Sequence, residues 1–209
     1  ERSRNVATLM PSMPTPHKYL KSLARALCFA IAAPSAALAQ PTDSLPAVAA
    51  PLRLEVSLSE RALSVYQGEE LVKQYPVAVG KPAHPTPNGS FQIQRVIWNP
   101  RWVPPDAQWA RGKQPRAPGD PLNPLGRVKM FFRTPDYYIH GTHQEDSLGQ
   151  AESHGCVRMR NPDVIELAQL VMQHGGEPRE PGWFQRVLNR VRSTSEVRLS
   201  QPVQVVIRE

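Results

Sequence analysis

Apolar residues recur at every second position in several short stretches of this chain, and this period constrains its fold more than any other feature. Residues 52–58 (LRLEVSL) alternate apolar and polar side chains, which is the pattern of a strand with one buried face. Further alternating or β-prone stretches lie at residues 63–79, 89–97, 128–132, 137–139 and 203–207. The 23 prolines in 209 residues disfavour a helical bundle. The sequence therefore predicts a mainly β fold.

Two helices are expected late in the chain. Asn161 suits the N-cap of the first helix, and Pro162 is tolerated in its first turn. Apolar residues recur at helical spacing from Val164 to Val171, and Gly175-Gly176 is a typical helix end. A second, basic amphipathic helix is expected over residues 183–192, with its basic face in solvent. The sequence therefore predicts a single domain over residues 52–209 that is mainly β. In class terms it is a β-rich α+β fold with its two helices late in the chain.

Residues 99–125 carry many Pro and Gly residues and match no regular element. A long irregular segment inside a compact domain is often a lid or a binding loop. Trp102 and Trp109 argue against a disordered insert, because disordered segments are poor in aromatic residues. We expect residues 99–125, called the capping segment below, to cover a site.

Residues 1–39 have the three regions of a secretory signal peptide. Lys18, Lys21 and Arg25 are basic, an apolar stretch follows, and Ala37-Leu38-Ala39 is an A-x-A cleavage site. Met13 would open a leader of ordinary length. Residues 40–51 are rich in Pro and Ala and are expected to be a linker. No apolar run reaches the roughly 18 residues of a membrane span, so no integral span is expected after cleavage.

Cleavage would remove five basic residues and one acidic residue, leaving 20 Lys+Arg against 17 Asp+Glu. This small excess does not supply the dense basic patch of a nucleic-acid-binding protein. Cleavage would also remove Cys28 and leave Cys156 as the single cysteine. A lone thiol in an exported protein cannot form an internal disulfide, and it indicates a reactive group or an intermolecular partner.

The candidate chemistry lies between residues 138 and 161. His140 ends an expected strand, and Cys156 lies 16 residues later, before the first expected helix. An imidazole can accept the proton of a thiol and so activate it as a nucleophile. Gly155 leaves room beside the thiol for a carbonyl group and for backbone N–H groups that would face a developing oxyanion.

These residues carry a resemblance to a known family. The motif HGT at residues 140–142, followed by SHGCVR at residues 153–158, resembles the signature of the L,D-transpeptidase catalytic domain (YkuD-type). Five further segments resemble the family in its own order: LSVY at 63–66, YPVAVGK at 75–81, PTPNGSF at 85–91, WNPRWVPP at 98–105 and PLGR at 124–127. The resemblance covers roughly residues 52–208, which is nearly the whole chain after the leader.

The resemblance implies a single β-sandwich domain and a role in cell-wall biogenesis and cell shape. Members attack the third-residue carbonyl of a peptidoglycan tetrapeptide stem and release the terminal D-alanine. The thioacyl-enzyme then reacts with an amine, giving a 3→3 cross-link or attachment of an outer-membrane lipoprotein; water would give an L,D-carboxypeptidase. The family uses no metal or cofactor, and carbapenems acylate its cysteine. With the leader, the resemblance implies a periplasmic location.

The resemblance also assigns roles to single residues. Cys156 would be the nucleophile and His140 the general base that later acts as an acid. The backbone of Gly141 would orient the imidazole in place of a carboxylate. The cysteine turn and the oxyanion site would be shaped by Ser153, His154 and Gly155.

Substrate contacts are less specific in the motif. Arg158 matches the arginine-bearing branch of the family, where a fixed cation would meet a carboxylate of the stem peptide. Tyr138 would line the donor pocket, although a tyrosine in the core fits the sequence equally well. His143 is not a signature position, and a solvated loop histidine is favoured.

Three alternatives remain at this point. Cys156 could be a small buried apolar residue. A zinc site could use His140, His143, His154 and Cys156, but the motif HExxH is absent and no general base is placed beside such a metal. A non-catalytic peptidoglycan-binding module would need neither the thiol nor the imidazole. The surrounding motif and the expected export disfavour an inert buried thiol, and the intact His–Cys pair disfavours the binding module.

Overall fold

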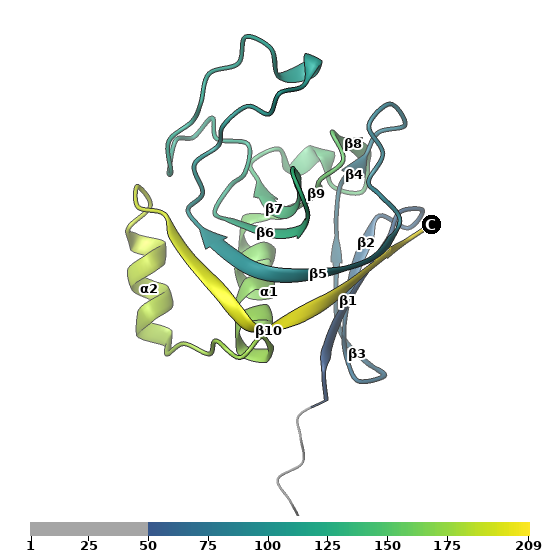
Figure 1. Ribbon diagram of the computed structural model, residues 1–209, viewed down its shortest axis with the longest axis vertical. Coiled ribbons are helices and arrows are strands. Elements are labelled where there is room, and N and C mark those ends of the chain that lie inside the picture. The colour runs from purple at the N-terminus through teal and green to yellow at the C-terminus, as the bar shows by residue number, and fades with distance from the viewer. Residues whose placement is uncertain (1–49) are drawn as a thin grey trace, which may run out of the picture. The chain divides into compact units, whose positions relative to one another are not determined.

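The structure, a computed structural model, describes residues 50–209. The expected signal peptide and most of the expected linker lie outside the described residues. The described part is mainly β, with two helices after Cys156. Its main sheet has eight strands in the order β3-β2-β1-β10-β5-β6-β7-β9 (Figure 1).

Most strands of the main sheet follow the alternating stretches of the sequence, whereas β9 and the first part of β10 do not. Their bounds are β1 Leu52–Ser57, β2 Ala62–Gln67, β3 Glu70–Pro76, β5 Gly89–Trp98, β6 Val128–Arg133, β7 Tyr137–Thr142, β9 Val157–Arg160 and β10 Ser195–Arg208. A small separate sheet pairs β4 (Val79–Gly80) with β8 (Ala151–Ser153). The described part therefore has one large sheet, a small two-stranded sheet and two helices, in agreement with the mainly β fold that was expected.

The last strand joins the two halves of the main sheet. β10 pairs parallel with β1 and antiparallel with β5. Its pairing with β5 shifts register between Arg198 and Val203, next to Pro202, which has no N–H to donate to the ladder. β10 bends along its length in Figure 1, and the strands β1–β3 run across the direction of β5.

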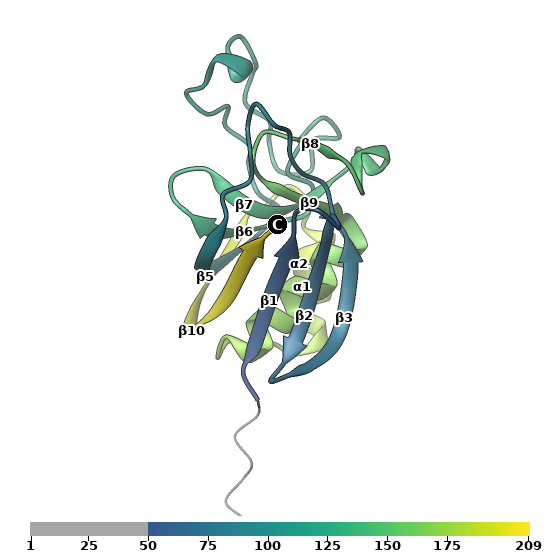
Figure 2. The ribbon, with the colours of Figure 1, turned by 90° about the vertical axis from the view of Figure 1, so that its right-hand side faces the viewer.

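Helix α1 (Asn161–His174) covers the side of the β6–β7–β9 half that faces away from the site described below (Figure 2). Its apolar stripe is fully buried among the strand residues of the core: Val164, Leu167, Ala168, Val171 and Met172. The helix ends before Gly175, and Gly176 has a φ of +78°, as expected at a helix end. Helix α2 spans Pro181–Asn189, so it begins two residues before the predicted range and ends three residues before its end.

One expectation about α1 is wrong. Asn161 is the first residue of the helix rather than its N-cap, and Arg160 holds the cap position without a side-chain cap bond. The Asn161 side chain instead accepts a hydrogen bond from the backbone N–H of Arg127 and donates one to the carbonyl of Thr142. Partners distant in the sequence have replaced the local capping bond.

The capping segment contains one short 3₁₀ turn, Gln108–Ala110. Trp102 and Arg116 exchange backbone hydrogen bonds, which closes the segment into a loop. The buried Asn123 side chain ties the base of this loop by donating to the carbonyls of Pro100 and Ala117 at 2.8 and 3.1 Å. The loop projects beyond the sheet at the top of Figure 1.

Among residues 50–209, neither helix combines the length and the apolar character that crossing a membrane requires.

Candidate active site

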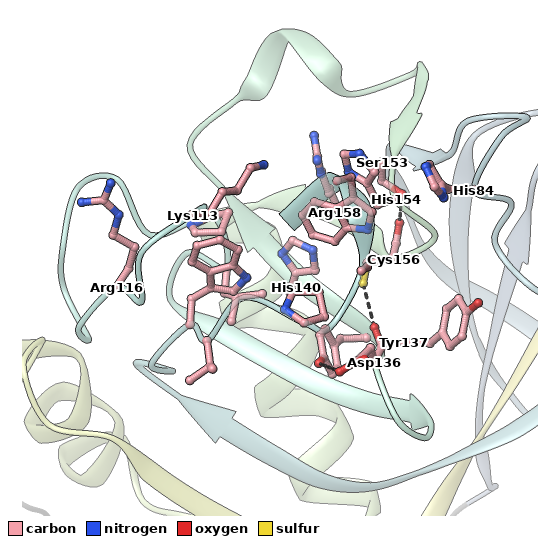
Figure 3. A pocket seen from close by; sticks show the side chains of 18 of the residues that line it. His84, Lys113, Arg116, Asp136, Tyr137, His140, Ser153, His154, Cys156 and Arg158 are labelled. Carbon is pink, nitrogen blue, oxygen red and sulfur yellow. Dashed lines mark hydrogen bonds between the residues drawn. The ribbon is translucent and has the colours of Figure 1, made fainter. Parts of the chain in front are cut away.

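A cavity of about 880 Å³ lies between the capping segment, β7 and the turn that precedes β9. Its lining includes His140, Cys156 and Arg158, together with Trp109 and Lys113 of the capping segment (Figure 3). The sequence candidates and the capping segment therefore meet at one cavity.

Strand pairing brings the histidine and the cysteine together. β7 and β9 are parallel neighbours, with His140 opposite Arg158 and Ile139 opposite Val157. Cys156 immediately precedes β9, so the thiol lies beside the strand that carries His140. The residues between them leave the sheet and return through β8. Figure 3 shows both side chains on the same cavity.

The imidazole of His140 is buried and held in one tautomer. Its Nδ1 lies 2.7 Å from the carbonyl oxygen of Gly141, and because a carbonyl can only accept, Nδ1 carries the proton. Nε2 is therefore left as an acceptor. Burial lowers the pKa of His140 to about 4, helped by the charges of Arg158 and Lys129 and opposed by the bond to Gly141. The resting imidazole is neutral at physiological pH.

Cys156 is a partly exposed free cysteine. Its Sγ donates to the backbone carbonyl of Asp136 at 3.3 Å. Burial raises the pKa of the thiol to about 11, against the opposing effects of a backbone hydrogen bond from Tyr138 and the charge of Arg158. The resting pair is therefore a neutral thiol beside a neutral imidazole, and not an ion pair.

The turn before Cys156 is fixed by Ser153 and Gly155. The Ser153 hydroxyl donates to the carbonyl of Cys156 at 2.5 Å and accepts from the N–H of Gly155 at 3.0 Å. Gly155 has a φ of +105°, and a Cβ there would lie 2.8 Å from a ring carbon of Tyr137. Both the backbone conformation and the available space therefore require glycine at this position.

His154 contacts two aromatic rings that the sequence did not predict as its neighbours. Its ring stacks on the indole of Trp109, with ring centroids 4.0 Å apart and planes at 16°. His84, from the loop before β5, also contacts this imidazole. The centroids of the two histidine rings are 5.0 Å apart. Burial lowers the pKa of His154 to about 4, and Lys81 contributes in the same direction. No local signal in the sequence links His84 or Trp109 to the cysteine turn.

Of the remaining candidates, Arg158 and Tyr138 line the same cavity and His143 does not. The guanidinium of Arg158 donates to the side-chain oxygen of Gln144 at 3.3 Å, a partner not anticipated from the sequence. Tyr138 lines the cavity, and its hydroxyl donates to Asp136 at 3.0 Å, which together with burial raises its pKa. The Tyr138 side chain is half-buried and also faces the cavity. It is therefore neither a fully buried core residue nor a freely exposed one. His143 is exposed.

The structure also bears on the zinc alternative. Within residues 50–209, no three His, Cys, Asp or Glu side chains are grouped as metal ligands would be. The rings that a zinc site would need have other partners, since His140 donates to Gly141 and His154 stacks on Trp109.

Comparison with known proteins agrees with this geometry. The YkuD family, the L,D-transpeptidase catalytic domain, matches residues 51–205. A putative L,D-transpeptidase YkuD of Bacillus licheniformis is 40% identical over 121 residues, covering 58% of this chain and 61% of that protein. A probable L,D-transpeptidase YbiS of Escherichia coli is 32% identical over 127 residues, covering 56% of this chain and 40% of that protein. The chain thus spans about three fifths or less of the length of these curated relatives.

Solved structures of the same description are more distant in sequence. The catalytic domain of an Enterococcus faecium L,D-transpeptidase aligns with a TM-score of 0.47 at 19% identity, covering 74% of this chain and 95% of that one. An L,D-transpeptidase from Mycobacterium smegmatis aligns with a TM-score of 0.46 at 14% identity, covering 77% and 59%. The family match over residues 51–205 confirms the resemblance inferred from the motifs, and the chain belongs to the family of L,D-transpeptidase catalytic domains.

Proposed function

We propose that this protein is an exported, periplasmic L,D-transpeptidase that acts on peptidoglycan stem peptides. The observation that carries the proposal is that a free cysteine, Cys156, and a histidine held in one tautomer, His140, line the same cavity. The signal-peptide pattern of residues 1–39 and the family membership support the location and the polymer.

The first half-reaction follows from the protonation states. The thiol turns from the Asp136 carbonyl towards Nε2 of His140, which takes its proton as Sγ attacks the third-residue carbonyl of a tetrapeptide stem. Backbone N–H groups at the Gly155–Cys156 turn stabilise the oxyanion. His140 then protonates the leaving amine, D-alanine departs, and a thioester to Cys156 remains.

The second half-reaction reverses these roles. An acceptor amine attacks the thioester carbonyl and gives a proton to His140, a new amide forms, and the thiol is regenerated. A second stem would give a 3→3 cross-link, whereas a lysine of an outer-membrane lipoprotein would give protein attachment. Water would make the protein an L,D-carboxypeptidase. The first half-reaction is common to all three acceptors.

The cations of the cavity suit a donor with free carboxylates. The guanidinium of Arg158 donates to the neutral side-chain amide of Gln144, and the charge of Glu152, on the same cavity, also acts on it. Lys113 faces the same cavity from the capping segment, with its ammonium 4.9 Å from the Trp109 ring. We assign Arg158 and Lys113 to the carboxylates of the stem, and Tyr138 to the wall of the donor site.

The test uses purified protein, a disaccharide-tetrapeptide and mass spectrometry, with and without a second stem. Loss of one alanine together with a dimer linked through the third residues is expected. Cys156→Ala should release no alanine, and His140→Ala should slow release by about 10²–10⁴-fold as the loss of a general base does. A carbapenem should add its mass to the wild type and not to Cys156→Ala.

The alternatives predict different results. Alanine loss without a dimer would assign water or a lipoprotein as the acceptor. Unchanged binding of the stem by Cys156→Ala, with no release by the wild type carrying a reduced thiol, would indicate the non-catalytic binding module.

A further inference from the structure

Asn161 bridges the backbones of two segments beside His140, at Arg127 and at Thr142. The pairing of β6 with β7 ends at Lys129 and His140, so the backbone of Thr142 extends past the last rung of that ladder. The Asn161 amide donates to the Thr142 carbonyl at 3.1 Å, and its oxygen accepts from the Arg127 N–H at 2.8 Å. One side chain thus continues the contact between the two strands where their own ladder stops.

Two glycines make the space that this side chain fills. A Cβ on Gly126 would lie 2.2 Å from Oδ1 of Asn161, and a Cβ on Gly141 would lie 2.3 Å from the same atom. Gly126 also has a φ of +60°, but Gly141 does not have a positive φ. Glycine at position 141 is therefore explained by the space that Asn161 occupies and not by backbone conformation.

The same glycine orients the candidate base. Gly141 supplies the carbonyl that accepts the Nδ1 proton of His140 at 2.7 Å. Asn161 packs against the Cα of Gly141 and bonds the next carbonyl along the chain, that of Thr142. It therefore restrains the peptide unit on the C-terminal side of Gly141, whose carbonyl direction selects the tautomer of His140.

We propose that Asn161 is a positioning residue for His140, acting through the wedge it forms between Gly126 and Gly141. The proposal rests on the function proposed above, in which Nε2 of His140 must be the free acceptor. Asn161 does not line the cavity, so its effect is on the imidazole and not on the substrate. A neutral amide also suits this place, since a carboxylate could not donate to the Thr142 carbonyl.

The decisive measurement is the tautomer of His140, read from its ring ¹⁵N shifts by NMR at a pH above its pKa. The wild type should show a single Nδ1–H tautomer, whereas Asn161→Ala should show a mixture. Release of D-alanine should fall by about 10- to 100-fold, because a misplacement on the order of 1 Å has such effects. The charged groups nearest the ring, Lys129 and Arg158, are unchanged in this variant.

Two further variants keep the test decisive if Asn161→Ala folds poorly. Asn161→Asp retains the acceptor for the Arg127 N–H, loses the donor to Thr142 and adds a negative charge beside that carbonyl. Gly141→Ala displaces the wedge without changing Asn161. Both should show the same tautomer mixture, whereas Asn189→Ala, an exposed asparagine at the end of α2, should match the wild type.

The outcome that overturns the proposal is a single Nδ1–H tautomer in the Asn161 variants with only a lower melting temperature. That result would make Asn161 a structural residue. Because the tautomer is read without substrate, it separates failure of this proposal from failure of the proposed reaction, which Cys156→Ala tests independently.

Discussion

The indole of Trp109 lies flat against the imidazole of His154, with ring centroids 4.0 Å apart. One ring belongs to the capping segment and the other to the residue two positions before the nucleophile. Near the tip of the loop, this stack joins the capping segment to the cysteine turn, whereas the base of the loop is tied by Asn123. The position of the loop and the shape of the turn are therefore coupled.

We expect Trp109→Ala to slow acylation of Cys156 by up to about tenfold, since a stacked aromatic pair contributes about 0.5–1.5 kcal/mol. Trp109 is only half-buried, so the melting temperature of the Trp109→Ala variant should be close to that of the wild type. Trp109→Phe should recover most of the rate because it keeps a ring on His154. The measurement is the rate of carbapenem adduct formation, with thermal unfolding in parallel. Equal rates for the alanine variant and the wild type would uncouple the loop from the turn.

Ser153→Ala should weaken the cysteine turn. The buried hydroxyl makes two hydrogen bonds, to the Cys156 carbonyl and from the Gly155 N–H. Removing it leaves both backbone groups without that partner, so we expect a loss of about 1–3 kcal/mol in the free energy of unfolding and slower acylation. Chemical denaturation measures the first effect. Ser59→Ala, at an exposed position, is the control and should change neither.

Gly155→Ala should be more damaging than a glycine substitution at an uncrowded turn. Gly149 also has a positive φ, +76°, but a Cβ there would meet nothing within 4 Å. Gly149→Ala therefore tests backbone strain alone, while Gly155→Ala adds a contact of 2.8 Å with Tyr137. We expect the Gly155 variant to lose more stability and most of its activity. Equal melting temperatures for the two variants would show that Tyr137 moves aside freely.

The neutral resting pair predicts a distinctive pH profile for alkylation. Because burial raises the pKa of Cys156 to about 11, its reaction with iodoacetamide should rise about tenfold per pH unit towards that value. Acylation by substrate should instead be nearly flat between pH 5 and 9. It should fall only as pH drops towards about 4, where His140 becomes protonated. A plateau of alkylation near neutral pH would indicate a thiolate–imidazolium pair.

Much of the sheet could be predicted because its strands alternate over five or more residues. β1, β2, β5 and β6 were expected close to their observed positions. β8 and β9 were not, since they are three and four residues long and directly flank the cysteine motif. The first part of β10, with Val197 and Leu199 buried, was also missed because Pro202 interrupts its alternation.

The contacts of the candidate site also fall into those that could be predicted and those that could not. The family resemblance implied the bond from His140 to Gly141, and it is present. The contact of Asn161 with Arg127, and that of His154 with Trp109, join residues that are far apart in the chain. Local capping rules gave Asn161 the wrong role, because no local pattern reports which distant backbone groups lack partners.

The pairing of β1 with β10 has a consequence for how the domain folds. Arg53 faces Gln204 in that ladder, so the first and last strands of the domain are neighbours in the middle of the sheet. Closing such a long loop carries an entropic cost that only the completed sheet offsets. The β1–β3 meander pairs strands that are close in the sequence, but it joins the half of the sheet that carries His140 only through β10. Because β1 and β10 are so far apart in the sequence, we expect the two halves of the sheet to join late in folding.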